Sequence, residues 1–276
     1  MRALSLLYHD VVGRDAADES GFPGGGPGVY KLEPAEFERH LAAIARGVPG
    51  HPALVWQLTD EAAASAPFLL TFDDGGRSAF ACIADLLERF GWRGHFFITT
   101  AYIGAPGFLT APEIRALDAR GHIIGSHSHS HPTRMSHRSA AELLTEWERS
   151  TRTLADLLGK PVRCASVPGG YYARKVAATA AAVGIRVLFT SEPTARCREV
   201  DGCLVLGRYS IRRGTSASTA AAYAAGRVLP RVRQQWFWNC KKVAKGLGGE
   251  VYLALRRVVY ARLAVHRSRA IQRLTP

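Results

Sequence analysis

The chain has 276 residues, of which 47% are hydrophobic and 21% are charged, and its formal net charge is +13. This composition excludes wholesale disorder, a collagen-like repeat and a coiled coil. No window reaches the roughly 18 consecutive apolar residues that a membrane span needs, and the apolar run at the start is too short for a signal peptide. The five cysteines are scattered without a C-x-x-C pair, which favours a reduced, cytoplasmic-type chain without a disulfide framework or a cysteine-based zinc site.

Short apolar runs typical of strands alternate with helical patterns through residues 1–226. Strands are predicted at 3–8, 68–72, 95–99, 123–126, 163–167, 186–190 and 204–208. Helices are predicted near 34–46, 78–90, 111–120, 140–158, 173–183 and 216–226. Such alternation implies right-handed βαβ crossovers and a parallel sheet, either a barrel or a doubly wound sheet. In both, the chemistry collects at the carboxyl ends of the strands.

Several helix boundaries carry their own signals. Thr110 with Glu113, and Ser139 with Glu142, predict capping boxes. Glycines stand where four of the helices should end, a position that favours a positive φ: Gly91, Gly121, Gly159 and Gly184. Residues 11–29 are rich in glycine and aspartate and are predicted to form a loop. After residue 226, two further helical patterns occupy about 230–246 and 250–270, and the second is amphipathic with a basic face.

Two adjacent aspartates, Asp73 and Asp74, follow the strand predicted at 68–72 and precede Gly75 and Gly76. Neighbouring strand residues point to opposite faces, so the two carboxylates can share one site only where the backbone bends. The glycines permit that bend. A polar turn that caps the next helix is the alternative interpretation.

Histidines are concentrated in residues 121–132, at His122, His127, His129 and His131. On a helical turn His127 and His131 share a face, and on a strand His129 would join them. Either geometry suits a divalent metal held by imidazole nitrogens. Unliganded surface histidines are the alternative, and His122, at the start of a strand, is expected to be structural.

A Pro-Gly-Gly sequence at 168–170 follows the strand predicted at 163–167, and Tyr171 comes directly after it. Such a loop exposes backbone N–H groups that could face a developing oxyanion. Taken alone, the sequence is more typical of a simple turn.

The order and spacing of these motifs resemble those of the polysaccharide deacetylase family, which is carbohydrate esterase family four with the NodB-homology domain. Its hallmarks are T-F-D-D-G, H-[ST]-x-x-H-P and a later R-x-P-[YG]-G-like loop, and the resemblance covers about residues 66–226. It implies an α/β fold in residues 1–226, a distorted, incomplete (β/α) barrel with about seven parallel strands. Residues 227–276 would form a basic, amphipathic helical extension. It also implies a hydrolase that acts on non-peptide carbon–nitrogen bonds.

The resemblance also implies roles for individual residues. Asp74, His127 and His131 would hold one divalent metal, usually zinc in this family. Asp73 would act as the general base toward a metal-activated water, and the backbone N–H of Gly169 would help to bind the oxyanion.

The sequence departs from the family pattern at two places. Ser166 stands where the family has an arginine that orients the base, and Arg208 could take over that role in space. The late Leu-x-His motif, which usually supplies the general acid, is missing, since no histidine lies between His137 and His266. A protonated Asp73 could return its proton instead. His9, His129 and Tyr171 are the candidates for further site residues with a secondary role.

The hypothesis favoured by these residues is a metal-dependent removal of an N-acyl group, in the simplest case N-acetyl, from an amino sugar of a polysaccharide or lipid-linked glycan. The alternative is a catalytically weak or silent glycan- or membrane-surface module on the same fold. An iron oxygenase could use the same two histidines and carboxylate, but it leaves Asp73 without a task. Adjacent aspartates are also too close to provide the roughly 5–9 Å separation that a glycosidase needs.

The basic end of the chain suggests where the protein works. Residues 227–276 contain twelve Lys/Arg and one acid, so they carry +11 of the formal charge of +13. A solvated helix packed on the body is one interpretation, and an anionic membrane surface is another, while nucleic acid is a weaker match. We expect a cytoplasmic enzyme, peripheral at the inner membrane, that acts in exopolysaccharide biosynthesis on an amino-sugar glycan. Each basic residue near that surface contributes about 1 kcal/mol.

Overall fold

The computed structural model describes residues 1–58 and 66–240. Its centre is one nine-stranded sheet in the order β7-β8-β6-β5-β4-β3-β2-β1-β9. Neighbouring strands pair in parallel, except that β7 and β8 are antiparallel. The strands are β1 (Leu4–Tyr8), β2 (Phe68–Phe72), β3 (His95–Ile98), β4 (Ile123–Ser126), β5 (Cys164–Ser166), β6 (Val187–Phe189), β7 (Arg198–Val200), β8 (Cys203–Leu206) and β9 (Arg208–Ser210).

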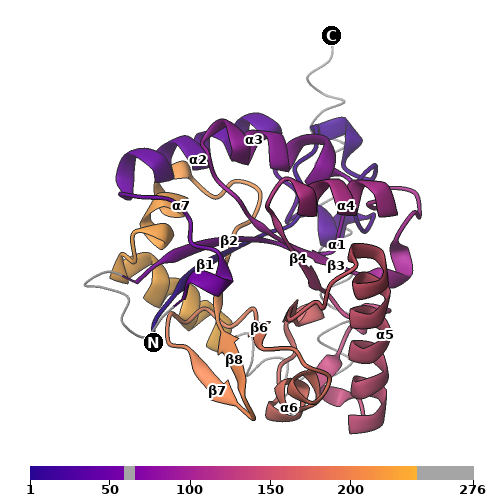
Figure 1. Cartoon of the computed structure of the whole chain (residues 1–276). Coiled ribbons are helices and arrows are strands. Elements are labelled where there is room, and N and C mark those ends of the chain that lie inside the picture. The colour runs from indigo at the N-terminus through magenta and orange to yellow at the C-terminus, as the bar shows by residue number, and fades with distance from the viewer. Residues whose placement is uncertain (59–65, 241–276) are drawn as a thin grey trace.

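The sheet curls into a barrel that its described strands leave unclosed (Figure 1). Strand β9 ends one side of the sheet and β8 lies near the other, yet Gly207 alone separates them along the chain. The chain therefore crosses the seam of the barrel at this residue. A Cβ on Gly207 would lie 2.3 Å from the carbonyl oxygen of Glu192, so the crossing requires glycine. The expected incomplete (β/α) barrel is confirmed.

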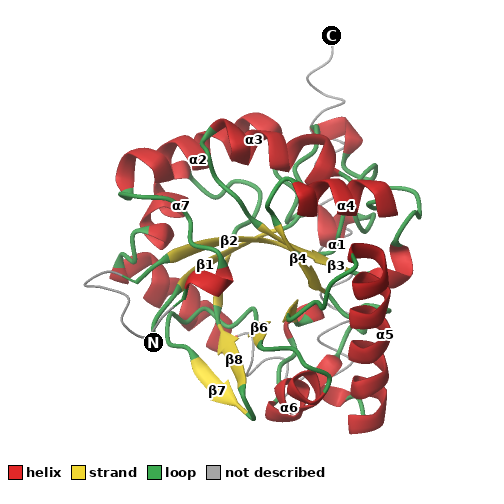
Figure 2. Ribbon diagram, viewed as in Figure 1, coloured by secondary structure: helices red, strands yellow, loops and turns green. Residues whose placement is uncertain are grey.

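Helices surround the barrel on its outside (Figure 2). Helices α2 and α7 pack against each other, and α7 also contacts β1. Helix α5 packs on α6 and β4. The helices are α1 (Gly25–Gly28), α2 (Pro34–Gly47), α3 (Ala84–Arg89), α4 (Ala111–Ala119), α5 (Ala140–Leu158), α6 (Arg174–Ala182) and α7 (Ala217–Ala224), followed by a helical segment at residues 228–240.

The alternation of side chains along each strand separates an outer core from the barrel interior. In β2, Phe68, Leu70 and Phe72 belong to the core under the helices, while Leu69 belongs to a second cluster with Phe97 of β3 and Phe189 of β6. Thr71 and Asp73 follow Leu69 at intervals of two residues. The same alternation that buries Leu69 therefore points Asp73 into the barrel.

Six of the seven predicted strands are confirmed to within one residue at each end. The seventh prediction, 204–208, spans two strands, because the seam at Gly207 divides β8 from β9. Strand β7 was not predicted, since Arg198 and Glu199 are exposed and give it no apolar signal.

The predicted helix boundaries are confirmed by their caps. Thr110 and Ser139 form complete capping boxes with the glutamates three residues on. The four boundary glycines all have positive φ, from +68° to +90°. The helix predicted at 78–90 begins as a π-helical turn at Ala79–Ile83, and the predicted loop at 11–29 contains two short helical segments, Arg14–Ala16 and α1. The helix predicted at 230–246 is helical from 228 to 240, and its remainder and the pattern at 250–270 lie outside the described residues.

Candidate active site

The turn after β2 brings two carboxylates to the same side of the backbone. The backbone N–H of Asp73 still bonds to the Tyr8 carbonyl, at 3.1 Å, as a continuation of the sheet. Asp74 then has a φ of +77° and Gly75 a φ of +81°. The expected bend therefore begins one residue earlier than Gly75, at Asp74 itself. A non-glycine residue in this region costs about 1–3 kcal/mol and is typical of functional sites.

Asp74, His127 and His131 form a cluster of metal-ligand type at the carboxyl ends of β2 and β4. Asp74 Oδ1 lies 3.4 Å from Nε2 of His127 and 3.5 Å from Nε2 of His131. One ligand atom from each residue lies within 4.8 Å of the others. A carboxylate with two imidazoles is a donor set that suits zinc and related divalent ions, with positions left for water and substrate. The donors therefore fit the metal that the resemblance implies.

Each imidazole of the cluster is also contacted by a residue outside the cluster. His127 Nδ1 lies 3.1 Å from the Ser166 carbonyl oxygen and also contacts the Ser166 hydroxyl, which leaves Nε2 directed at Asp74. His131 has a φ of +57°, and its ring centroid lies 4.7 Å from that of Phe22. Burial alone would raise the pKa of Asp74, but its bonds to the two histidines outweigh burial and hold the pKa well below its usual value.

Asp73 is held by Arg208, which reaches it through the barrel interior from β9. Arg208 is fully buried, and its Nη1 and Nη2 lie 2.7 and 2.8 Å from the two carboxylate oxygens of Asp73. The Ser166 hydroxyl donates to the same carboxylate at 3.0 Å. Burial would raise the pKa of Asp73, but Arg208 and then His127 outweigh it, so the pKa lies below its usual value. The carboxylate is thereby kept ionised and fixed in orientation.

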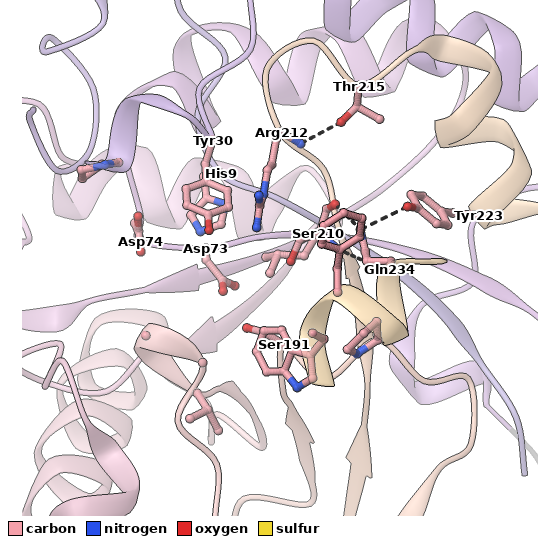
Figure 3. Close-up of a pocket in the computed structure, with 18 of the residues that line it drawn as sticks. His9, Tyr30, Asp73, Asp74, Ser191, Ser210, Arg212, Thr215, Tyr223 and Gln234 are labelled. Carbon is pink, nitrogen blue, oxygen red and sulfur yellow. Dashed lines mark hydrogen bonds between the residues drawn. The ribbon is translucent and has the colours of Figure 1, made fainter. Parts of the chain in front are cut away.

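Among the three candidates for secondary roles, His9 lies in the site (Figure 3). Its ring centroid lies 4.7 Å from that of Tyr30, and its Nδ1 is buried without a hydrogen-bond partner among the described residues. Burial lowers the pKa of His9, while the charges of Asp74 and Asp73 act in the opposite direction. His9 is thus a buried imidazole beside both carboxylates.

The other two candidates differ in their position. Tyr171 lines the cavity, next to Gly169 and Gly170. His129 is not among the lining residues, and its Nδ1 lies 2.9 Å from the Thr100 hydroxyl. Gly169 has a φ of +67°, and a Cβ there would lie 2.5 Å from the Thr133 carbonyl oxygen, so this turn requires glycine.

One large cavity of about 1150 Å³ at the carboxyl ends of the strands is lined by the Asp-His-His cluster together with His9, Asp73, Gly169 and Tyr171. Sequence reasoning missed several residues that line it, because no motif marks them: Phe22, Tyr30, Arg212, Arg233, Phe237 and Trp238. Phe22 and Tyr30 come from the glycine-rich segment after β1, and the last three come from residues 228–240. For Phe22 and Tyr30, their position on either side of the glycine run was a sequence signal that could have indicated a place in the site.

Known proteins resemble this chain in sequence and in fold. Residues 61–188 match the family model of polysaccharide deacetylases. The chain is 24% identical over 222 residues to YxkH of Bacillus subtilis strain 168, a protein provisionally named as a polysaccharide deacetylase, with 79% of this chain and 74% of that protein covered.

Two solved structures have a similar fold. The structure of IcaB from Ammonifex degensii has a TM-score of 0.66 and 20% identity, covering 81% of this chain and 97% of that one. The Streptococcus pyogenes deacetylase PplD in complex with acetate has a TM-score of 0.65 and 18% identity, covering 79% and 95%. At such identities the likeness is evidence of the fold.

The unclosed (β/α) barrel, with an Asp-His-His cluster at the carboxyl ends of its strands, is the arrangement that the resemblance implies, and the matched deacetylases support a deacetylase-type hydrolase. The match of residues 61–188 to the family model confirms that the chain resembles the polysaccharide deacetylase family, as its motifs indicate.

Proposed function

We propose that this protein is a metal-dependent deacylase that removes an N-acyl group, in the simplest case acetyl, from an amino sugar of a polysaccharide or lipid-linked glycan. One observation carries the proposal. Asp74, His127 and His131 place their ligand atoms close together. The adjacent Asp73 is not part of this cluster, and its carboxylate accepts two hydrogen bonds from Arg208. Two neighbouring carboxylates thus have different environments, which is the arrangement expected for a ligand and a base.

The three ligand candidates would hold one divalent ion, for which zinc is the natural choice. Such an ion supplies a Lewis acid for the acyl carbonyl and lowers the pKa of a water molecule. Asp73 accepts the proton of the attacking water, because Arg208 and Ser166 keep its carboxylate ionised and oriented. The water oxygen bonds to the acyl carbon, and the backbone N–H of Gly169 donates to the carbonyl oxygen as charge develops on it.

The carbon–nitrogen bond breaks only after the amine nitrogen has received a proton. We assign the donation to His9, because it lines the same cavity and its Nδ1 makes no hydrogen bond within the described part of the chain. His129 is the weaker candidate, since its Nδ1 is engaged with Thr100 and its side chain does not line the cavity. The products are a carboxylate, acetate in the simplest case, and the free amino sugar.

The experiment that tests the function is removal and return of the metal. The full chain is treated with a chelator, and release of acetate from N-acetylated chitooligosaccharides is measured before and after addition of zinc, cobalt or nickel ions. The proposal expects turnover to disappear on chelation and to return with at least one of these ions. Tight metal binding without turnover on any N-acetylated glycan would instead identify a binding module.

We further propose that the basic segment 227–276 brings the enzyme to an anionic membrane surface. Its net charge of +11 supports this placement, and its described part, 227–240, has three arginines and no acid. Among the described residues, none of the helices combines the length and the apolar character needed to cross a bilayer.

A further inference from the structure

Residues 228–240 form one wall of the active-site cavity. Their lining side chains are Leu229, Pro230, Arg233, Gln234, Phe237 and Trp238. Gln234 fixes this wall, because its amide nitrogen donates to the Ser210 carbonyl at 2.9 Å and to the Tyr223 hydroxyl at 3.2 Å (Figure 3). The helix is therefore part of the site, and a chain cut at residue 226 would lose a wall of the cavity.

The outer face of the same helix is apolar and exposed. In the described part of the chain, seven large hydrophobic residues are exposed, and five of them lie in this one helix. Their exposed fractions are 70% for Val228, 81% for Leu229, 53% for Val232, 63% for Trp236 and 51% for Phe237. Such clustering within residues 228–240 marks an interaction surface, whereas single exposed apolar residues would not.

The exposed apolar surface is continuous with the cavity wall. Residues four apart lie on the same face of a helix, so Val228, Val232 and Trp236 form one stripe. Leu229 and Phe237 are both exposed and cavity-lining, and thus connect the stripe to the site. The stripe therefore borders the cavity that contains the metal-ligand cluster.

The charges at the cavity indicate what joins the apolar chain to the sugar. Arg212 and Arg233 both line the cavity, and the guanidinium of Arg212 lies over the Tyr30 ring at 5.5 Å. The carboxylates among the described lining residues are Asp73 and Asp74, both already engaged by histidine or arginine. A neutral glycan offers these arginines no counter-charge, whereas a phosphate group is a strong acceptor for guanidinium.

We propose that the substrate is an amino sugar linked through phosphate to a lipid, and that the stripe of Val228, Val232 and Trp236 lies against the membrane that holds it. This inference rests on the proposed deacylase function and specifies its substrate class. Arg212 and Arg233 bind the phosphate, and the sugar extends inward to Asp73 and the ligand cluster. The net charge of +11 on residues 227–276 complements anionic headgroups.

The test compares two N-acetylglucosamine probes on the full, metal-loaded chain. One is phytanyl-phospho-N-acetylglucosamine in vesicles of phosphatidylglycerol and phosphatidylethanolamine, and the other is N-acetylated chitotetraose in solution. The proposal expects kcat/KM for the lipid-linked probe to exceed that for the soluble one by at least about tenfold, the factor equivalent to about 1.4 kcal/mol of apolar burial. Equal or better turnover of chitotetraose would overturn it while leaving the deacylase function intact. No turnover of either probe would instead count against the deacylase function on which the proposal rests.

Variants then locate the binding surface. Val232→Ser with Trp236→Ser should lower kcat/KM about tenfold for the lipid-linked probe alone and reduce co-sedimentation with the vesicles. Trp56→Ser is the matched control, since Trp56 is also 50% exposed but lies in the turn at Val55–Gln57, outside the cavity lining. Arg212→Gln with Arg233→Gln should raise KM for the same probe.

Two results would contradict the membrane as the occupant of the stripe. If sedimentation velocity shows a dimer that the Trp236→Ser variant dissociates, the stripe contacts a second copy of the chain. If the stripe variants and Trp56→Ser behave alike toward both probes, another part of the protein covers the stripe.

Discussion

Arg208 makes two hydrogen bonds to the carboxylate of Asp73 although 134 residues separate them along the chain. The guanidinium also donates from Nε to the Thr190 carbonyl at 3.0 Å and packs near the rings of Phe97 and Phe189. It occupies the interior of the barrel, where a charge persists only when it is paired. The position of Ser166, where the resemblance implies an arginine, holds a small side chain that touches both Asp73 and His127. Arg208, from a different strand, therefore makes the contact to Asp73 that the resemblance assigns to an arginine at position 166.

Replacing Arg208 by glutamine should reduce both stability and turnover. The change leaves Asp73 buried without its counter-charge, which typically costs about 3–5 kcal/mol. Arg208 holds the pKa of Asp73 down, so its loss raises that pKa and shifts the acid limb of the kcat profile to higher pH. A carboxyl whose pKa is lowered by folding stabilises the fold at pH values above its pKa in the unfolded chain. The difference in stability between the native chain and the Arg208→Gln variant should therefore shrink as pH falls below about 4. Urea unfolding and a pH–rate profile measure these effects.

Arg152→Gln is the control for this substitution, because Arg152 is exposed on α5. It should leave both measurements unchanged. An Arg208→Gln protein with the stability and acid limb of the native chain would show that the ion pair does not set the state of Asp73.

Moving the arginine to the position of Ser166 provides a second test of the same relationship. Ser166→Arg alone places another guanidinium in an interior already filled by Arg208, and overpacking of this kind destabilises. The double variant Ser166→Arg with Arg208→Ser contains one arginine again. A double-mutant cycle of unfolding free energies should give a favourable coupling of about 1–3 kcal/mol. Additive effects would mean that the two positions do not serve the same carboxylate.

The two aspartates should respond differently to the same chemical change. Asp74→Asn should weaken zinc binding and abolish turnover, since it removes the charged ligand of the cluster. Asp73→Asn should keep the metal and lose turnover by about 100-fold or more, the usual contribution of a general base. Metal content after dialysis, together with acetate release, separates the outcomes. Asp156→Asn, at an exposed position of α5, is the control, and equal metal loss in both site variants would mean that the roles have been assigned wrongly.

The role of His9 can be tested by changing the leaving group. His9→Gln should lower amide turnover by about 100-fold, because the departing amine then lacks its proton donor. Hydrolysis of 4-nitrophenyl acetate should change little, since 4-nitrophenolate leaves without a proton. His51→Gln, at an exposed loop position, is the control. Equal loss with both substrates would place His9 in metal or substrate binding and exclude it as the acid.

Much of the fold follows from local sequence signals. The features that the sequence did not predict depend on contacts between distant parts of the chain. Helix α5 begins at the Ser139 capping box and ends at Gly159, both visible in the sequence. Asp74, His127 and His131 could be selected because they stand in short, ordered motifs. Arg208 could be suggested but not placed, because its partner depends on the crossing at Gly207, which no local pattern reports. The wall at 228–240 was missed as part of the site for the same reason: its packing depends on long-range contacts such as Gln234 with Ser210.

The stability of the chain should decrease in mildly acidic solution because of His95, whose side chain is fully buried in β3. Its Nδ1 lies 2.9 Å from the Leu70 carbonyl oxygen, the Val55 N–H donates to its Nε2, and burial lowers its pKa to about 4. The unfolded chain binds a proton there at about pH 6.5 and the folded chain does not, so stability is lost as pH falls from about 6.5 to about 4, by about 1.4 kcal/mol per pH unit for this group. Urea unfolding of the metal-free protein at several pH values should show a flatter dependence for His95→Gln than for the native chain, while the exposed His51→Gln should follow the native curve. Parallel curves for His95→Gln and the native chain would show that His95 is not held neutral in the fold.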